Sequence, residues 1–311
     1  MENKPKVGID VAKDRLDVKA VPSGQAFVFR RDGEGIAALV EQLRLLDPEI
    51  VAVEATGGLE KVVAAALAAA SLPVVMVNPA QIRAFAQALG KRAKTDPIDA
   101  EVIARFVEAT RPEIRPLPDE AAELLSDLVT RRRQIVQMIG AEKQREKRTS
   151  QPRLKRSIAR LVAALQRELT DLDGQIGEEV DNSPLWREKR DLLTSVPSIG
   201  KTIAHTLLAE LPELGALNRR QVAALAGLCP WTRKSGQWKG KSFIAGGRAP
   251  VRSALFVAAL VAVRWNPALK TFHQRLIAAG KEKMVALIAV ARKLLTILNA
   301  ILRDKSPWQI A

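Results

Sequence analysis

Residues 6–11, Lys-Val-Gly-Ile-Asp-Val, are the first of three closely spaced apolar runs near the start of the chain. They form an apolar run with one acidic residue, Asp10, and two further runs of the same kind follow at 15–21 and 26–30. Short polar joints separate the three runs. Apolar runs of this length, rich in Val, Ile and Phe and bounded by turn-forming residues, predict β-strands. The chain is therefore expected to begin with three strands.

Outward from these strands, the pattern alternates between helix and strand up to about residue 110. The expected elements, in order, are a helix at 35–46, a strand at 49–54, a helix at 59–70, a short buried strand at 73–77 and a helix at 80–89. The order βββαβαβα predicts a mixed sheet with helices packed on it.

The rest of the chain is predicted to be mostly helical. From 119 to about 179 the sequence is long, charged and helical, with a break near Ser150-Gln151-Pro152, which fits two long antiparallel helices. Helical segments around a Gly-rich basic loop at 231–250 follow. The expected fold class is α/β plus α. Its expected parts are an N-terminal catalytic domain at 1–112, a helical coiled-coil-like linker at 113–184 and a mostly helical C-terminal domain at 185–311.

Composition excludes several kinds of chemistry. The chain has 311 residues, one cysteine (Cys229), two histidines (His205 and His273) and no tyrosine. A single cysteine excludes an internal disulfide framework and suits a reducing compartment. Zinc-finger spacing is impossible with these residues, so a metal site has to be built from carboxylates. The absence of tyrosine rules out DNA breakage by a tyrosine nucleophile.

Charge is distributed very unevenly along the chain. Of the formal net charge of +15, residues 1–110 contribute −1, residues 111–180 contribute +2 and residues 181–311 contribute +14. Within the middle block, residues 131–160 carry eleven basic side chains against two acidic ones. Segregation on this scale predicts a polyanionic partner, either nucleic acid or an acidic membrane surface.

A membrane is the weaker of these two partners. The first five residues are not followed by an apolar stretch of signal-peptide type. The uncharged stretch at 62–82 contains two prolines, and the apolar run at 254–263 is too short to cross a bilayer. We expect a soluble cytoplasmic protein with no membrane partner.

Four acidic residues occur at strand ends and at a helix start. Asp10 lies inside the first strand, where burying an ionised carboxylate is costly without a compensating partner. Glu54 ends the strand at 49–54, directly before Thr56-Gly57-Gly58. Asp96 and Asp99 are three residues apart, which places them on one face of a helix. Taken singly, each acid also fits a structural role as a capped strand end, a turn residue or a helix cap.

Together, the four acids resemble the metal site of the ribonuclease H-like fold. Four ionised carboxylates close together require a cation, because like charges raise each other's pKa. Two Mg²⁺ ions roughly 4 Å apart would neutralise them and hold a phosphodiester. Asp14 and Asp17 are expected to be solvated turn and strand positions. Glu101 is expected to point away from the face that carries Asp99.

A second candidate group is the cationic loop around Ser235. One interpretation is a flexible loop that contacts phosphate with Ser235 as one donor; the other is a nucleophilic serine. No histidine is near in sequence, so a Ser-His-Asp arrangement is not supported, and activation would have to come from a metal-bound group or a carboxylate elsewhere. Trp231 and Trp238 in the same loop would either stack on bases or anchor the loop to the core.

The segment Val196-Pro197-Ser198-Ile199-Gly200-Lys201-Thr202 separates two apolar helical segments. It is similar to a helix-hairpin-helix turn, in which backbone N–H groups at Gly200 and the next helix start bind phosphate without reading bases. A plain helix hairpin has the same pattern.

An ordered set of motifs along nearly the whole chain resembles the DEDD-type insertion-sequence transposases of the IS110 family, described as bridge-RNA-guided recombinases. The motifs are Gly8-Ile9-Asp10-Val11-Ala12-Lys13, Val53-Glu54-Ala55-Thr56-Gly57, Asn78-Pro79, Lys94-Thr95-Asp96, Asp99-Ala100, Pro197-Ser198-Ile199-Gly200, Ala226-Gly227-Leu228, Ser235-Gly236, Gly246-Gly247, Arg252-Ser253-Ala254-Leu255 and Asn266-Pro267. One departure is Ser198, where the family hairpin more often has glycine.

This resemblance implies a Holliday-resolvase-like DEDD domain joined by a helical hairpin to a C-terminal transposase domain. Asp10, Glu54, Asp96 and Asp99 match the acidic quartet, and Ser235 matches the nucleophilic serine. The implied reaction is Mg²⁺-dependent DNA strand exchange through a serine-linked intermediate, at a site composed from two protomers. The implied partners are donor and target DNA, an element-encoded guide RNA and further copies of the chain, as a dimer or tetramer.

The residues expected to contact nucleic acid lie in the two basic regions. They are Arg131, Arg132, Arg133, Lys143, Arg145, Lys147, Arg148, Gly200, Lys201, Arg233, Lys234, Lys239, Lys241, Arg248 and Arg252. Two alternative functions remain open from sequence. One is a metal-dependent nuclease or junction resolvase in which water attacks the phosphodiester. The other is a nucleic-acid-binding protein without catalytic activity.

Overall fold

The computed structural model describes residues 4–91, 96–232, 234–235, 238–240 and 242–309. The chain forms two compact units, Met1–Leu117 (unit 1) and Pro118–Ala311 (unit 2), each with its own core. The division into three parts at 112 and 184 stays a prediction.

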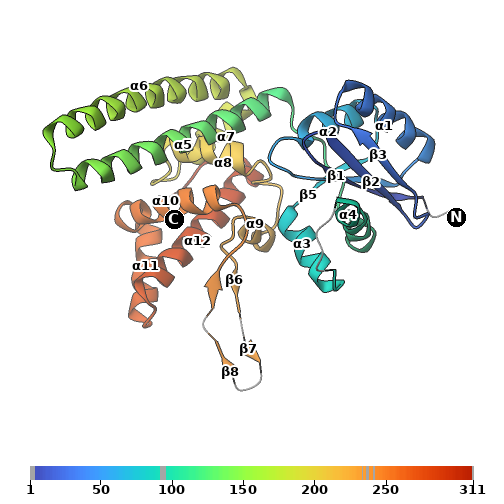
Figure 1. Ribbon diagram of the computed structural model, residues 1–311. Coiled ribbons are helices and arrows are strands. Elements are labelled where there is room, and N and C mark those ends of the chain that lie inside the picture. Colours follow the sequence, from blue (N-terminus) through green and yellow to red (C-terminus); the bar gives the residue numbers. More distant parts are fainter. Residues whose placement is uncertain (1–3, 92–95, 233, 236–237, 241, 310–311) are drawn as a thin grey trace. The chain divides into compact units, whose positions relative to one another are not determined.

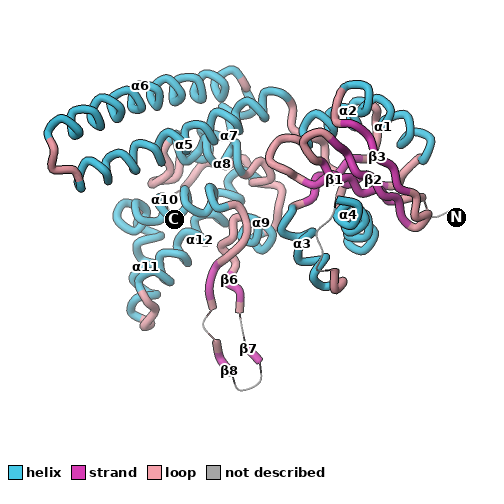
Figure 2. Tube along the Cα trace, viewed as in Figure 1, coloured by secondary structure: helices cyan, strands magenta, loops and turns pink. Residues whose placement is uncertain are grey.

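Unit 1 is built on a mixed sheet, as the strand order predicts. Its described residues form five strands: β1 (Lys6–Val11), β2 (Arg15–Val21), β3 (Ala26–Arg30), β4 (Ile50–Glu54) and β5 (Val74–Val77). The strand order is β3-β2-β1-β4-β5. Pairs β1–β2 and β2–β3 are antiparallel, whereas β1–β4 and β4–β5 are parallel. Figure 2 shows the strands of this sheet in magenta and the helices of unit 1 in cyan beside them. This arrangement confirms the expected ribonuclease H-like fold.

Helices cover both faces of this sheet. On one face, alternate residues such as Ile9 and Val53 pack with α1 (Gly33–Leu46) and α2 (Glu60–Ala69). On the other face, residues such as Ala52 pack with α3 (Pro79–Ala88) and α4 (Asp96–Thr110). The period-2 alternation of β-strand side chains explains how one apolar strand contributes to two cores.

Gly8 determines how closely α4 approaches the sheet. A Cβ atom at Gly8 would lie 2.3 Å from the carbonyl O of Ala100 and 2.4 Å from the backbone N of Ala104. Only glycine fits at this close contact between β1 and α4. The start of α4 is therefore held against the strand that carries Asp10.

Unit 2 begins with the long helix pair that the charged pattern predicts. Helices α5 (Glu120–Arg148) and α6 (Pro152–Asn182) run side by side (Figure 1). Ile135 and Ile139 of α5 pack with Val162 and Leu172 of α6. The break at Ser150-Gln151-Pro152 falls where it is predicted.

The other helices of unit 2 surround an apolar core. They are α7 (Pro184–Thr194), α8 (Lys201–Glu210), α9 (Arg219–Leu225), α10 (Ala249–Trp265), α11 (Pro267–Ala278) and α12 (Lys283–Asp304). By length and composition, α12 could cross a membrane, as could α10 and α11 taken as one bent span. However, Val290, Leu294 and Leu298 of α12 are fully buried in the unit 2 core, which accounts for its apolar sequence.

The region predicted as a Gly-rich loop contains short strands. Among its described residues, β6 (Pro230–Trp231) pairs with β9 (Phe243–Ile244), and β7 (Lys234–Ser235) pairs with β8 (Trp238–Lys239). Figure 1 shows β7 and β8 farther from the helices of unit 2 than β6 and β9. The sequence predicts a loop here but not these short strands, because two-residue strands leave no alternating pattern in the sequence.

Candidate active site

Asp10 and Glu54 lie next to each other at the carboxyl end of the parallel strand pair. The register aligns Gly8 with Ala52 and Ile9 with Val53, so Asp10 and Glu54 follow as the next residues on the two strands. Because side chains alternate, Asp10 shares the face of Gly8, and Glu54 shares the face of Ala52. That is the face covered by α4. Both acids are half-buried.

Asp99 joins this face from the helix. It lies in α4 directly before Ala100, whose carbonyl O approaches Gly8, and it is half-buried. Asp96 is the first residue of α4, and its side chain lies outside the described residues. Asp10 and Glu54 thus lie on one face of the sheet, and Asp99 lies on the helix that covers this face. Their convergence with Asp96 stays a prediction.

The donor chemistry of these acids fits Mg²⁺. Carboxylate oxygens are hard ligands, which Mg²⁺ prefers, and the sequence has no cysteine or histidine in the segment that carries these acids. Among the described side chains, no three Asp, Glu, His or Cys residues are grouped closely enough to hold one ion, and Asp96 is outside that set. A complete set of metal ligands therefore requires Asp96, or a carboxylate side chain that changes its rotamer when the ion binds.

Asp17 is not the solvated strand position that the sequence predicts. It is only 3% exposed, and it pairs directly with Asp10 across the β1–β2 ladder. The reason is that β2 is covered on both faces, with Leu16 and Val18 in one core and Asp17 beneath α4. Asp14, by contrast, is exposed as predicted.

Glu60 shapes the turn that follows Glu54, and sequence reasoning missed it. Its Oε2 accepts hydrogen bonds from the backbone N–H groups of Thr56 (3.1 Å) and Gly58 (2.7 Å) and from the Thr56 hydroxyl (3.2 Å). Glu60 is 8% exposed. The positive φ angles of Gly57 and Gly58 (80° and 113°) allow the backbone to turn around this carboxylate. The sequence signal that could have identified this contact is an acidic residue, Glu60, four positions after Thr56.

Glu101 pairs with two basic residues, and its direction relative to Asp99 stays a prediction. It forms ion pairs with Lys91 (3.1 Å) and Arg105 (2.7 Å). Burial alone would raise the pKa of Glu101, but hydrogen bonds and charge interactions with these two cations outweigh it, and the net pKa is lowered. Glu101 is therefore neutralised by its own partners.

Ser235 belongs to unit 2, whereas the four acids belong to unit 1. It is the second residue of β7, is exposed, and pairs with Trp238 of β8. The predicted contacts Arg233 and Lys241 lie outside the described residues, as do the side chains of Lys234 and Lys239. Trp231 is 59% exposed, so it does not anchor the hairpin in the core.

The turn before α8 leaves the start of the helix without a side-chain cap. Gly200 is the N-cap of α8, and no side chain caps it. Gly200 and Lys201 are both exposed. Ser198 has a φ of 103°, a conformation that favours glycine, and its buried hydroxyl has no hydrogen-bond partner among the described residues.

Several of the predicted basic contacts are bonded within unit 2. Arg132 pairs with Asp173 (2.6 Å) and Arg133 with Glu210 (2.8 Å). Arg248 forms two bonds to Glu213 (2.6 and 2.7 Å) and a third to the carbonyl O of Glu210. Arg252 donates to the carbonyl O of Gly246, and Arg145 pairs with Glu142. These five arginines are thus bonded within unit 2, which the sequence did not reveal.

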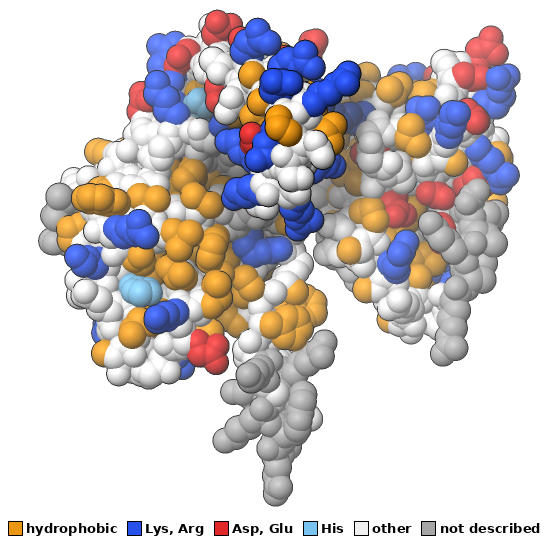
Figure 3. Space-filling view, turned by 60° about the vertical axis from the view of Figure 1, so that its left-hand side comes forward, with side chains coloured by type: hydrophobic (Ala, Val, Ile, Leu, Met, Phe, Trp, Pro, Cys, Tyr) orange, Lys and Arg blue, Asp and Glu red, His pale blue; other side chains and the backbone are white. Residues whose placement is uncertain are grey.

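Exposed cations remain on the long helices. Arg131, Lys143, Lys147 and Arg148 of α5 are all exposed. Figure 3 shows Lys and Arg side chains gathered in the upper part of the view, where the helix pair lies. This surface suits the phosphate backbone of a nucleic acid.

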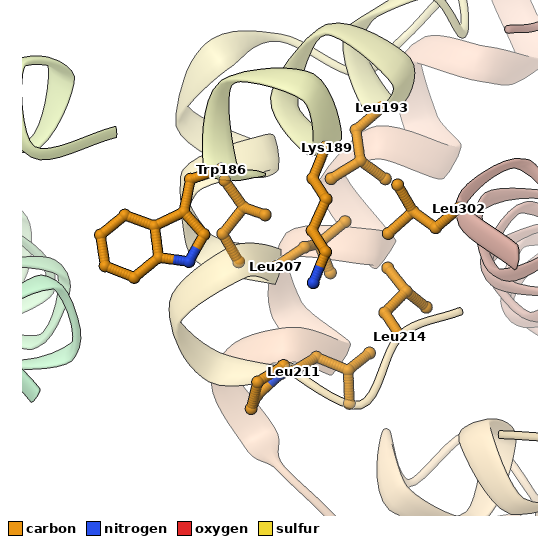
Figure 4. Close-up of a pocket in the computed structure, with 9 residues that line it drawn as sticks. Trp186, Lys189, Leu193, Leu207, Leu211, Leu214 and Leu302 are labelled. Carbon is orange, nitrogen blue, oxygen red and sulfur yellow. The ribbon is translucent and has the colours of Figure 1, made fainter. Parts of the chain in front are cut away.

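A pocket in unit 2 is not part of the candidate active site. It is lined by Trp186 and Lys189 of α7 and by leucines such as Leu207, Leu211 and Leu302 (Figure 4). Lys189 is the one charged side chain in this lining. Without a second polar group beside it, the pocket offers no constellation for catalysis.

Comparisons with known proteins agree with this architecture. The family model of the DEDD transposases of IS110 elements matches residues 7–149, and that of the transposase IS116/IS110/IS902 family matches residues 190–274. The pilin gene-inverting proteins of Moraxella bovis and Moraxella lacunata are each 30% identical, over 98% of both chains. An uncharacterized 43.6 kDa protein of insertion element IS110 from Streptomyces coelicolor is 31% identical, over 48% of this chain and 36% of that protein.

The ribonuclease H-like sheet with its acids and the matching family models define a DEDD-type transposase, an enzyme that acts on DNA. The chain belongs to the IS110 family of transposases.

Proposed function

We propose that this transposase exchanges DNA strands of a mobile insertion sequence through a covalent serine–DNA intermediate, and that an element-encoded RNA selects its sites. The placement of Asp10 and Glu54 side by side under α4 supports phosphodiester cleavage most directly, whereas the serine intermediate and RNA guidance rest on the resemblance to the family. It gives the sheet a carboxylate pair where a ribonuclease H-like enzyme cleaves phosphodiesters, and the exposed Ser235 supplies a hydroxyl for the covalent step.

The acidic site is proposed to hold divalent cations through Asp10, Glu54, Asp96 and Asp99. Bound Mg²⁺ would supply charge neutralisation at the phosphodiester oxygens. Glu60 holds the turn after Glu54 in place, and Gly8 holds α4 close to β1. Both contacts limit how far the carboxylates move, which is what a preorganised site requires.

In the proposed covalent step, the Ser235 Oγ forms a bond to phosphorus while the bond from phosphorus to one DNA strand end breaks. The serine proton passes to a basic group at the acidic site, and the leaving strand end takes up a proton as a hydroxyl. Attack by another strand's hydroxyl then restores the serine. The resemblance implies that carboxylates and serine come from two protomers.

Nucleic-acid binding is proposed for the exposed surface of α5 and for the start of α8. Lys143, Lys147 and Arg148 offer cations, and Gly200 and Lys201 offer backbone N–H groups. Oligomer formation is supported by an exposed apolar strip on α10, comprising Val257, Leu260, Val261 and Trp265. A strip of this kind on a helix marks an interaction surface.

Recombination with purified protein, donor and target DNA and RNA transcribed from the flanking element tests the proposal. Asp10→Asn and Ser235→Ala are expected to abolish recombinant product. Ser242→Ala is the matched control, because Ser242 is an exposed serine in the same hairpin region. Recombination by Ser235→Ala at the unchanged rate would overturn the serine assignment, and full activity without RNA would overturn guidance.

The alternative with water as the nucleophile is a junction resolvase or nuclease. It requires the same acids but leaves Ser235 only in contact with phosphate. With water as the nucleophile, the Ser235→Ala variant should still cut DNA and leave free ends. With serine as the nucleophile, the same variant should leave the DNA uncut.

A further inference from the structure

Asp17 adds an acidic side chain to the sheet face that carries Asp10. The two residues are directly opposite in the antiparallel β1–β2 ladder, so their side chains project to the same face. Helix α4 packs against both strands on this face. Asp17 is 3% exposed and therefore belongs to the floor beneath the helix rather than to the solvent-facing rim.

The two oxygens of Asp17 have different environments. Oδ1 lies 2.5 Å from Nη2 of Arg15, whose side chain is 47% exposed. Oδ2 is buried and accepts no hydrogen bond from any residue that the structure describes. An unpaired buried carboxylate oxygen is costly. Asp17 Oδ2 is thus a buried acceptor without a partner among the described residues, on the sheet face that also carries Asp10.

We propose that Asp17 is a positioning residue that strengthens divalent cation binding at the acidic site through its charge and through the placement of Asp10. This inference rests on the proposed function, which puts a cation beside Asp10. Side chains immediately behind metal ligands commonly change metal affinity without touching the ion. The alternative is that Arg15 and Asp17 form an ion pair that only stabilises β2.

Binding of Mn²⁺ alone to the full-length protein distinguishes these roles. Electron paramagnetic resonance of free Mn²⁺ reports affinity without requiring catalysis. Asp17→Asn keeps the shape of the side chain and is expected to weaken Mn²⁺ binding about 10- to 100-fold. Asp14→Asn removes the same charge from an exposed residue of the neighbouring turn and is expected to change affinity less than about threefold, because exposed charges are screened.

Arg15→Gln provides a second variant with the opposite expectation. This substitution removes the positive charge that pairs with Asp17 and competes with the metal ion for its negative charge. Mn²⁺ should therefore bind to this variant at least as tightly as to the unchanged protein. Thermal unfolding without metal shows whether each variant is folded. If Asp17→Asn does not fold, weaker Mn²⁺ binding by Arg15→Gln would overturn the inference.

The Asp10→Asn variant separates this inference from the proposed function. If it loses Mn²⁺ binding while Asp17→Asn matches Asp14→Asn, Asp17 has only a structural role. If Asp10→Asn binds Mn²⁺ like the unchanged protein, the proposed acidic site itself fails.

Discussion

Gly8 is the residue that allows α4 to lie against β1. Gly8→Ala would place Cβ 2.3 Å from one backbone atom of α4 and 2.4 Å from another, and backbone cannot move aside as a side-chain end can. We expect a loss of about 1–3 kcal/mol in the free energy of unfolding, as for other overpacked sites. Urea denaturation measures it. Gly33→Ala, where a Cβ meets nothing within 4 Å, is the control and should be close to neutral.

Ser198 stores backbone strain in the turn before α8. Its φ of 103° favours glycine, and its buried hydroxyl has no partner in the described part of the chain. Ser198→Gly is expected to raise the free energy of unfolding by about 1 kcal/mol, since relief of strain exceeds the added flexibility of the unfolded chain. Ser198→Ala keeps the strain and should be less stable than Ser198→Gly; equal stabilities would contradict this explanation.

The candidate acids could be identified from sequence because each occupies a position with a recognisable pattern. Asp10 interrupts an apolar run, Glu54 precedes a glycine pair, and Asp96 and Asp99 have helical spacing. Asp17 could not be identified in the same way. Whether a strand acid is solvated depends on what covers the strand, and α4 is more than seventy residues away in sequence.

At the scale of elements, the sequence predicts the whole βββαβαβα series and the long helix pair with its break. Hydrophobic periodicity is strong in these segments, and it decides both type and order. The paired strands β6 to β9 were missed because each has only two residues. The internal bonds of Arg248 and Arg132 were missed because a basic residue in sequence gives no sign of a distant carboxylate partner.

Helix α8 carries a buried histidine that makes stability depend on pH. Burial of His205 lowers its pKa, and the nearby charges of Arg190 and Lys201 lower it further, while Asp173 and Asp181 oppose the shift. The folded state therefore binds this proton less readily than the unfolded state. Stability should fall as pH drops below about 6.5, the ordinary histidine value, towards the lowered pKa of the folded state.

Urea unfolding at pH 7.5 and pH 5.5 measures this dependence. His205→Gln should lose less stability between the two values than the unchanged protein does. His273→Gln, on α11, is the control. If His205→Gln and the unchanged protein show the same loss, the buried histidine does not account for the pH dependence.

At the scale of the whole molecule, the surplus positive charge is expected to act through exposed cations rather than ion-paired ones. Replacing Lys143, Lys147 and Arg148 with glutamine should weaken DNA and RNA binding. The slope of log affinity against log salt should fall by about 0.7–0.9 for each lost phosphate contact. Arg132→Gln, which breaks the pair with Asp173, should mainly lower stability. Filter binding at several salt concentrations measures this slope. A triple variant with the slope of the unchanged protein would contradict the assignment of these three residues to phosphate contacts.

In the proposed reaction, the acidic face of unit 1 and Ser235 of unit 2 act in one covalent step. The most direct measurement is mass spectrometry of the protein–DNA adduct trapped under denaturing conditions with Mg²⁺, RNA and labelled donor DNA. We expect a nucleotide attached to Ser235, no adduct with Ser235→Ala, and none with Asp10→Asn. Cleaved DNA without any adduct, or an adduct on another residue, would contradict it.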